Sequence, residues 1–276
     1  MKRPLPKKIL VTGANGKCGT ALVGLPPNTV FLDRHDPCET MAGRPFVVAD
    51  LVDQPAVERA FDGVDAVVHL AASSHRESSW DDVLRDNILG TRSVLEAARA
   101  TGVELIVFAS TNHVVGLYET DLAPAIYDET HPLCLDHHAE LRPDSFYAVS
   151  KAAGEALCRF YAETGGPRCY CIRIGALLGA EDDHPYGYAE QGIRQGRWKR
   201  HDPEYELKVR RLKAIWHSRR DFLQQVEKCL AYDGPPFDIF YGVSDNASRW
   251  FDLEHARTLL GYRPVDRSDA WTSRPL

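Results

Sequence analysis

The chain of 276 residues lacks any apolar run near the ~18 residues that a membrane span requires. It also lacks internal repeats and low-complexity segments, and its basic start, Met1–Lys8, is not followed by a secretory signal. Its seven cysteines are scattered, and only Cys169 and Cys171 lie close together, so neither a disulfide framework nor a cysteine-ligated zinc site is expected. These absences favour a cytoplasmic protein with free thiols.

The composition is that of an ordinary globular protein. Hydrophobic residues make up 44% and charged residues 26%, which is enough apolar material for a substantial core. The net charge is −6, yet residues 194–220 hold ten Lys and Arg against three acids. Such a basic segment in an acidic protein either attracts an anionic ligand or forms a solvated helix, and its pattern fits both. Neither nucleic acid nor a membrane is an expected partner.

Short apolar runs alternate with helical patterns along the first 175 residues. Helices are expected over 53–61, 80–100 and 147–161. The expected strands are 8–12, 29–33, 46–50, 65–70, 104–109 and 168–174. Several of these runs are almost continuously apolar, as strands buried on both faces are. The alternation predicts an α/β fold of the Rossmann type, a doubly wound parallel sheet covered on both faces. A long loop rich in Pro, His and Asp is expected to end at Ser145.

The alternation of strand and helix patterns becomes less regular beyond residue 175, which suggests that the chain has two parts. We expect residues 1–175 to form the sheet domain with the catalytic residues, and residues 176–276 to form a small substrate-binding region. Asp202-Pro203 is typical of a helix start, with an acid as cap and Pro at the first position. A late strand at 238–243 and a helix over 252–260 are expected to return to the core.

Three glycines mark a nucleotide-binding turn. Gly13, Gly16 and Gly19 follow the first strand and open a helix, so the backbone can approach a pyrophosphate at the helix N-terminus. A plain glycine-rich turn is the alternative, which the strand-turn-helix context disfavours. Asp33 closes the second strand, where a carboxylate binds ribose hydroxyls and repels a 2′-phosphate, so NAD is favoured over NADP. Arg34 could meet that phosphate, so use of NADP as well stays open.

The other expected NAD contacts lie at strand ends and in the turns after them. Asp50 ends the third strand, where it either reaches the adenine or only caps a helix. The complete expected set of NAD-binding residues is Gly13, Asn15, Gly16, Lys17, Cys18, Gly19, Asp33, Arg34, Asp50, Leu51, Leu70, Ala71, Ala72, Asn87, Ala109, Tyr147, Lys151 and Ile174.

Tyr147 and Lys151 stand four residues apart in a helical stretch, so they share one face. A free Tyr titrates near pH ~10, and a fixed positive charge alongside it lowers that pKa. Such a Tyr can take a proton from an alcohol while another group removes the hydride. The spacing by itself fits a solvated pair on a helix surface equally well.

Taken together, the motifs resemble those of the extended short-chain dehydrogenase/reductase family. They are the glycine turn, the segment Asn87–Thr91, Thr111 after the fifth strand, and the Tyr147-Lys151 pair, in that order. The resemblance covers essentially the whole chain. It implies that Thr111, Tyr147 and Lys151 are the catalytic residues. Tyr147 would be the acid/base, Lys151 would lower its pKa and bind the nicotinamide ribose, and Thr111 would hold the reacting hydroxyl.

Segment 108–116 is similar to one in uronate dehydrogenases and in the NAD-dependent glucose-6-phosphate dehydrogenases of halophilic archaea. Those enzymes oxidise the anomeric hydroxyl of an aldose to a lactone. This chain departs from the uronate enzymes at Thr111, which replaces a Ser, and at Ala176, which stands where they carry a Ser. The resemblance implies a set of sugar contacts, with Arg211 at the distal anionic group: Ser74, Thr111, Asn112, His113, Tyr147 and Arg211.

Simpler interpretations of three features remain. His113 can be a hydrogen-bonded residue at a strand end, and the stem of Arg211 can merely cover apolar surface. The run Asp136–Glu140 includes two histidines, as metal sites do. The resembling family needs no metal, so we expect none and take this run as a solvated loop.

On this resemblance we expect NAD-dependent oxidation of an anionic aldose to its lactone, with a hexuronate, hexose 6-phosphate or sulfonated sugar as substrate. A nucleotide-sugar epimerase or dehydratase would share the same catalytic residues. A non-catalytic NAD-binding regulator is less favoured, because Tyr147 and Lys151 are both kept. Family members pair through helices equivalent to 80–100 and 147–161, which implies a homo-oligomer, a dimer or higher. The sequence does not specify the sugar, the lactone ring size or the oligomeric state.

Overall fold

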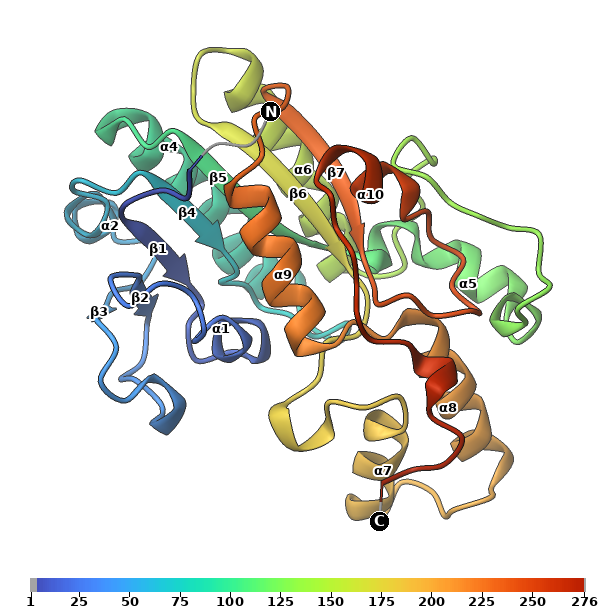
Figure 1. Cartoon of the computed structure of the whole chain (residues 1–276). Coiled ribbons are helices and arrows are strands. Elements are labelled where there is room, and N and C mark those ends of the chain that lie inside the picture. The colour runs from blue at the N-terminus through green and yellow to red at the C-terminus, as the bar shows by residue number, and fades with distance from the viewer. Residues whose placement is uncertain (1–3, 276) are drawn as a thin grey trace.

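Seven parallel strands form one sheet in the computed structural model, which describes residues 4–275 (Figure 1). Their order is β3-β2-β1-β4-β5-β6-β7, and every neighbouring pair is parallel. The strands are β1 (Ile9–Thr12), β2 (Val30–Asp33), β3 (Phe46–Val48), β4 (Ala66–His69), β5 (Leu105–Thr111), β6 (Arg168–Ile174) and β7 (Phe237–Gly242). The chain runs outward from β1 to β3 and then returns to β4 on the other side of β1. This reversal confirms the doubly wound sheet and locates its ligand crevice at the carboxyl ends of the strands.

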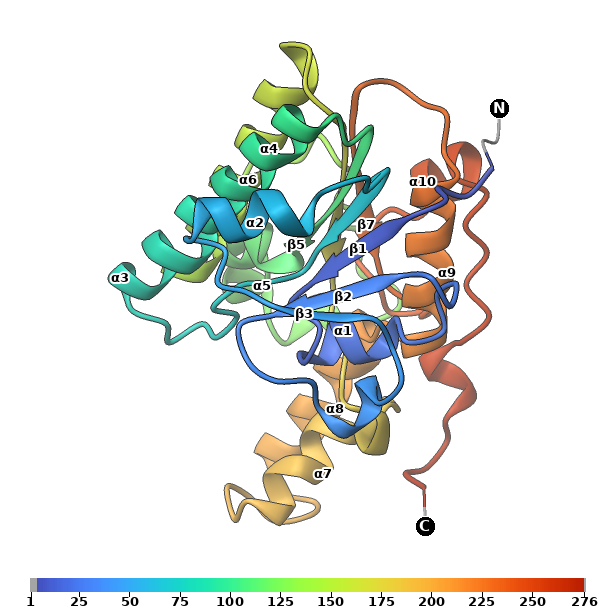
Figure 2. The same ribbon diagram turned by 90° about the vertical axis from the view of Figure 1, so that its left-hand side faces the viewer.

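Helices cover both faces of the sheet (Figure 2). One face carries α2 (Gln54–Ala60), α4 (Gly90–Thr101) and α6 (Phe146–Glu163), and the other carries α1 (Lys17–Ala21) and α9 (Arg219–Leu230). Successive residues of a strand point to opposite faces. Leu10 accordingly belongs to one apolar core and Val11 to the other, and both side chains are fully buried. The near-continuous apolar strands are explained by these two cores.

The helix expected over residues 80–100 is not continuous. It consists of α3 (Trp80–Asp82), a π-helical segment η2 (Val83–Leu89) and then α4. Asn87 is buried in the π-helical segment, where its amide nitrogen donates to Ser150 Oγ at 2.8 Å and to the Ser73 carbonyl at 3.0 Å. The wider turn of a π-helix is common at functional sites. Here the π-helical segment holds Asn87, whose hydrogen bonds join the loop after β4 to α6.

Two helices were not expected from the sequence. The long loop before Ser145 includes α5 (Gly116–Leu122), and α7 (Gly187–Arg194) follows β6. Both begin at a glycine, which has a poor helix propensity and hides the start of each helix. The remaining helical elements are α8 (Pro203–Ile215), α10 (Glu254–Leu259), η1 (Glu39–Met41), η3 (Asn112–Val115), η4 (Ala125–Tyr127), η5 (Ala180–Asp182) and η6 (Ser268–Ala270).

The chain after β6 both extends the sheet and builds a separate cap. β7 pairs with β6 along its whole length, and α7 and α8 stand beyond the carboxyl ends of the strands (Figure 1). The apolar stripe of α8 is buried, with Tyr205 5% and Val209 5% exposed. Helix α8 begins at Pro203 as expected, but the Asp202 carboxylate accepts from the Lys199 N–H at 2.7 Å and does not cap the helix.

The described residues 4–275 contain no helix long and apolar enough to cross a membrane. All seven cysteines are free thiols, and Cys158, Cys169, Cys171 and Cys229 are buried. Residues 1–3, which begin the basic segment noted in the sequence, lie outside the described residues.

Candidate functional site

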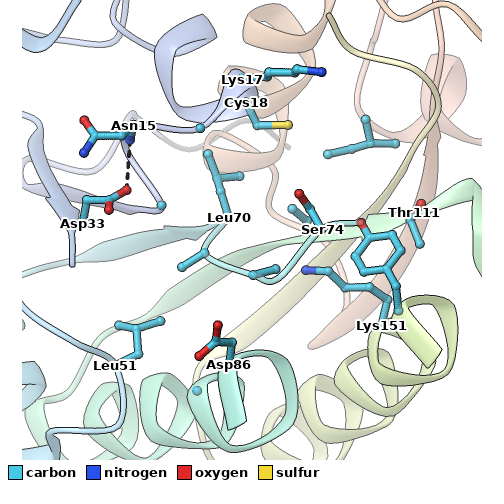
Figure 3. Close-up of a pocket in the computed structure, with 18 of the residues that line it drawn as sticks. Asn15, Lys17, Cys18, Asp33, Leu51, Leu70, Ser74, Asp86, Thr111 and Lys151 are labelled. Carbon is cyan, nitrogen blue, oxygen red and sulfur yellow. Dashed lines mark hydrogen bonds between the residues drawn. The ribbon is translucent and has the colours of Figure 1, made fainter. Parts of the chain in front are cut away.

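A cavity of about 690 Å³ opens at the carboxyl ends of the central strands (Figure 3). Nearly all of the expected site residues line it. Those from the NAD set are Gly13, Asn15, Gly16, Lys17, Cys18, Asp33, Arg34, Asp50, Leu51, Leu70, Ala71, Ala72, Ala109, Tyr147, Lys151 and Ile174, and Ser74, Thr111 and His113 come from the sugar set. Four expected residues are not part of its wall: Gly19, Asn87, Asn112 and Arg211.

The glycine turn forms one end of the cavity, and two of its glycines are required by close contacts. Gly13 has φ +73°, and a Cβ there would lie 2.6 Å from the Ala71 nitrogen. A Cβ on Gly19 would lie 2.3 Å from the Ala14 carbonyl oxygen. Gly19 therefore acts by allowing the turn to close and does not touch the cavity. Such a turn leaves room for a pyrophosphate against the backbone, so the residues present fit a dinucleotide.

Acidic side chains line the same end of the cavity. The Asp33 carboxylate accepts from the Asn15 N–H at 3.0 Å, the bond drawn in Figure 3. Arg34 donates to Asp86 at 3.1 Å. Burial opposes ionisation of Asp50, but hydrogen bonds from Arg85 and Val52 outweigh it and lower the pKa of that carboxyl. Because Arg34 is engaged by Asp86, this end of the cavity keeps the negative character that favours ribose hydroxyls over a 2′-phosphate.

The expected catalytic residues meet at the other end of the cavity. Thr111 ends β5, and α6 begins with Tyr147 in its first turn and Lys151 one turn later. Ser145 caps this helix by accepting from the Ala148 N–H at 3.2 Å. In Figure 3 Lys151 and Thr111 lie together at the opposite side of the cavity from Asn15 and Asp33. The end of β5 and the first turns of α6 thus bring a hydroxyl, a phenol and an ammonium to one place.

The electrostatics of this group differ from the expectation. Burial raises the pKa of Tyr147 above its ordinary value, and only a hydrogen bond from Thr111 opposes the rise. Lys151 is 3% exposed, and burial lowers its pKa to about 8. Its ammonium lies 4.7 Å from the centroid of the Phe108 ring, whose face is attractive to a cation. The prediction that the Tyr147 pKa is lowered is therefore wrong for this structure, because desolvation of the phenol dominates.

His113 also lines this end of the cavity, and a buried carboxylate fixes its ring. Its Nδ1 lies 2.7 Å from Asp144 Oδ2. Burial opposes ionisation of Asp144, yet its bond to His113 holds the pKa of the carboxyl below the ordinary range. A Cβ on Gly116 would lie 2.4 Å from the same carboxylate oxygen, so this glycine makes room for Asp144. Because Nδ1 is held by Asp144, Nε2 is the ring nitrogen left to bind another group. Asp144 was not expected from the sequence.

Arg211 lies outside the cavity wall and is paired within the protein. Its Nε and Nη2 donate to the two carboxylate oxygens of Glu119 at 2.6 and 3.0 Å. The Tyr127 hydroxyl donates to the same carboxylate at 2.8 Å. Burial opposes ionisation of Glu119, but the Arg211 charge lowers the pKa of this carboxyl. Asn112, 3% exposed in η3, is also away from the wall. Asn112 and Arg211 were both expected to contact the sugar, but the structure places neither in the cavity wall.

The cavity also has lining residues that the sequence did not indicate. Asp86 is the lining residue that the sequence could most readily have indicated, because it immediately precedes Asn87 of the segment Asn87–Thr91. Ala176, noted as a departure from uronate dehydrogenases, forms part of the wall. The residues of the wall that were not predicted are Leu32, His35, Ala49, Val52, His75, Asp86, Gly90, Ser110, Gly175, Ala176 and Leu177.

Comparison with known proteins gives one consistent result. Residues 9–223 match the NAD dependent epimerase/dehydratase family. The NAD-dependent glucose-6-phosphate dehydrogenase of Haloferax volcanii is 37% identical over 97% of this chain and 97% of its own. The uronate dehydrogenase of Pseudomonas putida is 32% identical over 96% of this chain and 86% of its own. The crystal structure of uronate dehydrogenase from Agrobacterium tumefaciens is 29% identical, with a TM-score of 0.75 over 98% of this chain and 91% of that one.

Proposed function

Since the chain belongs to the NAD-dependent epimerase/dehydratase family, we propose that it oxidises an anionic aldose at the anomeric carbon to a lactone. The cofactor is NAD, which this family binds. The observation that most supports the proposal is that Thr111, His113, Tyr147 and Lys151 line one cavity with the glycine turn. The relatives named glucose-6-phosphate and uronate dehydrogenases, matched over nearly the whole chain, support an acidic sugar as substrate.

The residues that would hold NAD divide along the cavity. The glycine turn would receive the pyrophosphate, Asp33 the adenosine ribose and Lys151 the nicotinamide ribose. When bound, NAD supplies the hydride acceptor and a positive charge that favours the phenolate form of Tyr147. Such a charge would oppose the desolvation that raises the pKa of Tyr147.

The chain's own groups would handle the proton and the orientation of the sugar. Thr111 and Tyr147 line the same end of the cavity, so a sugar hydroxyl that binds both would be aligned with the phenol oxygen. Tyr147 would accept the proton of the anomeric hydroxyl. Lys151, with a pKa of about 8, is mostly charged at neutral pH and would stabilise the resulting phenolate. His113, fixed by Asp144, would bind a second sugar hydroxyl through Nε2.

A substrate screen tests the proposal. NADH formation would be followed with glucuronate, galacturonate, glucose 6-phosphate, sulfoquinovose, glucose and UDP-glucose. We expect turnover of at least one acidic sugar and much less of glucose. Conversion of UDP-glucose without net NADH would indicate an epimerase or dehydratase instead.

Arg211 is the proposed source of selectivity for the anion. This role requires its guanidinium to leave Glu119 and reach the anionic group of the sugar, because Arg211 pairs with Glu119 outside the cavity wall. Arg211→Ala should lower kcat/KM for the accepted acidic sugar about 10- to 150-fold more than for its neutral parent, as expected from a charge-assisted hydrogen bond of ~1.5–3 kcal/mol. Glu119→Gln is the matched control, because it removes the charge that now pairs with Arg211 but keeps the shape. This control should retain the preference for the anion. Equal losses on both sugars in Arg211→Ala would show that Arg211 only holds Glu119.

A further inference from the structure

His137, Asp238 and His255 form a compact cluster outside the cofactor cavity. Each offers one ligand atom, and these atoms all lie within 4.8 Å of one another. His255 Nε2 lies 2.8 Å from Asp238 Oδ1. The rings of His137 and His255 are stacked with centroids 3.8 Å apart, and Phe240 stacks on His255 at 5.1 Å. Two imidazoles and a carboxylate at this separation match the ligand types of zinc sites.

One polar atom of the cluster is left unexplained by the protein's own contacts. Nδ1 of His137 is buried and has no hydrogen-bond partner among the described residues. Buried polar atoms nearly always have a partner, and an orphan commonly marks a water or an ion. His138, its chain neighbour, lies with its ring centroid 3.9 Å from that of His137 and so provides a further imidazole nearby.

The three residues come from separate segments, and backbone hydrogen bonds join the segments of His137 and His255. Leu135 accepts from the Asp252 N–H at 2.9 Å and donates its own N–H to the Trp250 carbonyl at 2.8 Å. This bridge lies two residues before His137 and three residues before His255. Asp238 is the second residue of β7, and its Oδ1 also accepts from the Ile239 N–H at 2.8 Å. The backbone therefore fixes the positions from which the side chains approach.

We propose that His137, Asp238 and His255 bind a divalent transition metal ion of the Zn²⁺ type, with water or His138 as the fourth ligand. Bonds of ~2.0–2.1 Å in a tetrahedral site separate ligand atoms by roughly 3.3 Å. Atoms now within 4.8 Å of one another would approach by up to about 1.5 Å to reach that spacing, through side-chain rotations that unstack the two rings. This proposal departs from the expectation, drawn from the family resemblance, that the protein holds no metal and that the Asp136–Glu140 run is a solvated loop.

The position of the site indicates a structural role. Asp238 lies at the beginning of β7, whereas the cofactor cavity opens at the carboxyl ends of the parallel strands. The metal would instead join the segment after η4 to β7 and α10. Asp144, which fixes His113, lies seven residues after His137 in the same segment. Bound metal would thus stabilise the segment that leads into the catalytic helix α6.

The full chain, without an affinity tag and treated with a chelator, should bind one equivalent of Zn²⁺ in a calorimetric titration. Saturation with Zn²⁺ should raise its melting temperature by roughly 5 °C, since a ligand that binds only the folded state stabilises it. Co²⁺ in place of Zn²⁺ should give the visible absorption of a four-coordinate ion without a thiolate charge-transfer band.

Variants separate this site from other metal-binding groups. His137→Ala and Asp238→Asn should each lower Zn²⁺ affinity at least tenfold, while their metal-free melting temperatures show that they fold. Cys134→Ser is the matched control, because Cys134 is an exposed thiol in the same segment, and His201→Ala removes an exposed histidine elsewhere. Both controls should bind Zn²⁺ as the parent does. Absence of binding, binding unaffected by His137→Ala and Asp238→Asn, or binding lost in Cys134→Ser would overturn the proposal.

Discussion

Tyr147→Phe is expected to lower kcat for NADH formation by about 10²–10⁴-fold, the usual contribution of a positioned acid/base. The substitution removes only the phenol oxygen and leaves the ring in the cavity wall. NAD binding should therefore be retained, because the glycine turn and Asp33 are untouched. Steady-state kinetics and quenching of intrinsic fluorescence by NAD would measure the two effects separately.

Tyr232→Phe is the control for that experiment. Tyr232 packs on Phe240 and Tyr170 and is not part of the cavity wall, so loss of its hydroxyl should leave kcat within twofold. If Tyr147→Phe kept more than a tenth of the parent activity, another group would have to accept the proton. If it lost NAD binding instead, a non-catalytic role for the phenol would be indicated.

Gly13→Ala should weaken NAD binding by about 10- to 100-fold, in line with the ~1–3 kcal/mol that overpacking costs. The new Cβ would stand 2.6 Å from the Ala71 nitrogen and 2.7 Å from its Cα, so the turn or the β4 loop must shift. Both lie in the cavity wall. The shift would narrow the space for the pyrophosphate. Titration with NAD followed by fluorescence measures the change in Kd.

Gly102→Ala separates this effect from backbone strain. Gly102 has φ +78°, close to the +73° of Gly13, but a Cβ there meets nothing within 4 Å. The left-handed backbone should cost each variant about 1–2 kcal/mol of stability. Gly13→Ala should lose more, because its Cβ also clashes with Ala71. Only Gly13→Ala should lose NAD affinity. Equal affinities in the two variants would mean that the turn does not hold the pyrophosphate.

Most of the fold could be predicted because its signals are local. Each strand of the sheet is a short apolar run, and alternation with helices implies parallel pairing. The glycine turn, Thr111 and the Tyr147-Lys151 pair are likewise contiguous motifs at strand ends. Their presence in one cavity follows from the topology, since all parallel strands end at the same edge. No comparable local pattern in the sequence indicates that η2 interrupts the helix expected over 80–100.

Contacts between distant segments could not be predicted. Asp144 meets His113 across 31 positions and Glu119 meets Arg211 across 92, and nothing in either local sequence specifies its partner. Arg211 pairs with Glu119 and is not part of the cavity wall. The raised pKa of Tyr147 could not be predicted for a similar reason. Spacing shows that Lys151 is on the same helix face, but the desolvation of the phenol depends on the packed structure.

Oxidation at the anomeric carbon is tested most directly by following the hydrogen atom bound to C1 of the sugar. The acidic sugar accepted in the screen would be prepared with deuterium at C1 and incubated with the enzyme and NAD. Mass spectrometry of the nicotinamide product should show one deuterium per molecule of NADH, with the lactone as the sugar product. NADH without deuterium would mean that the hydride comes from another carbon and would contradict the account.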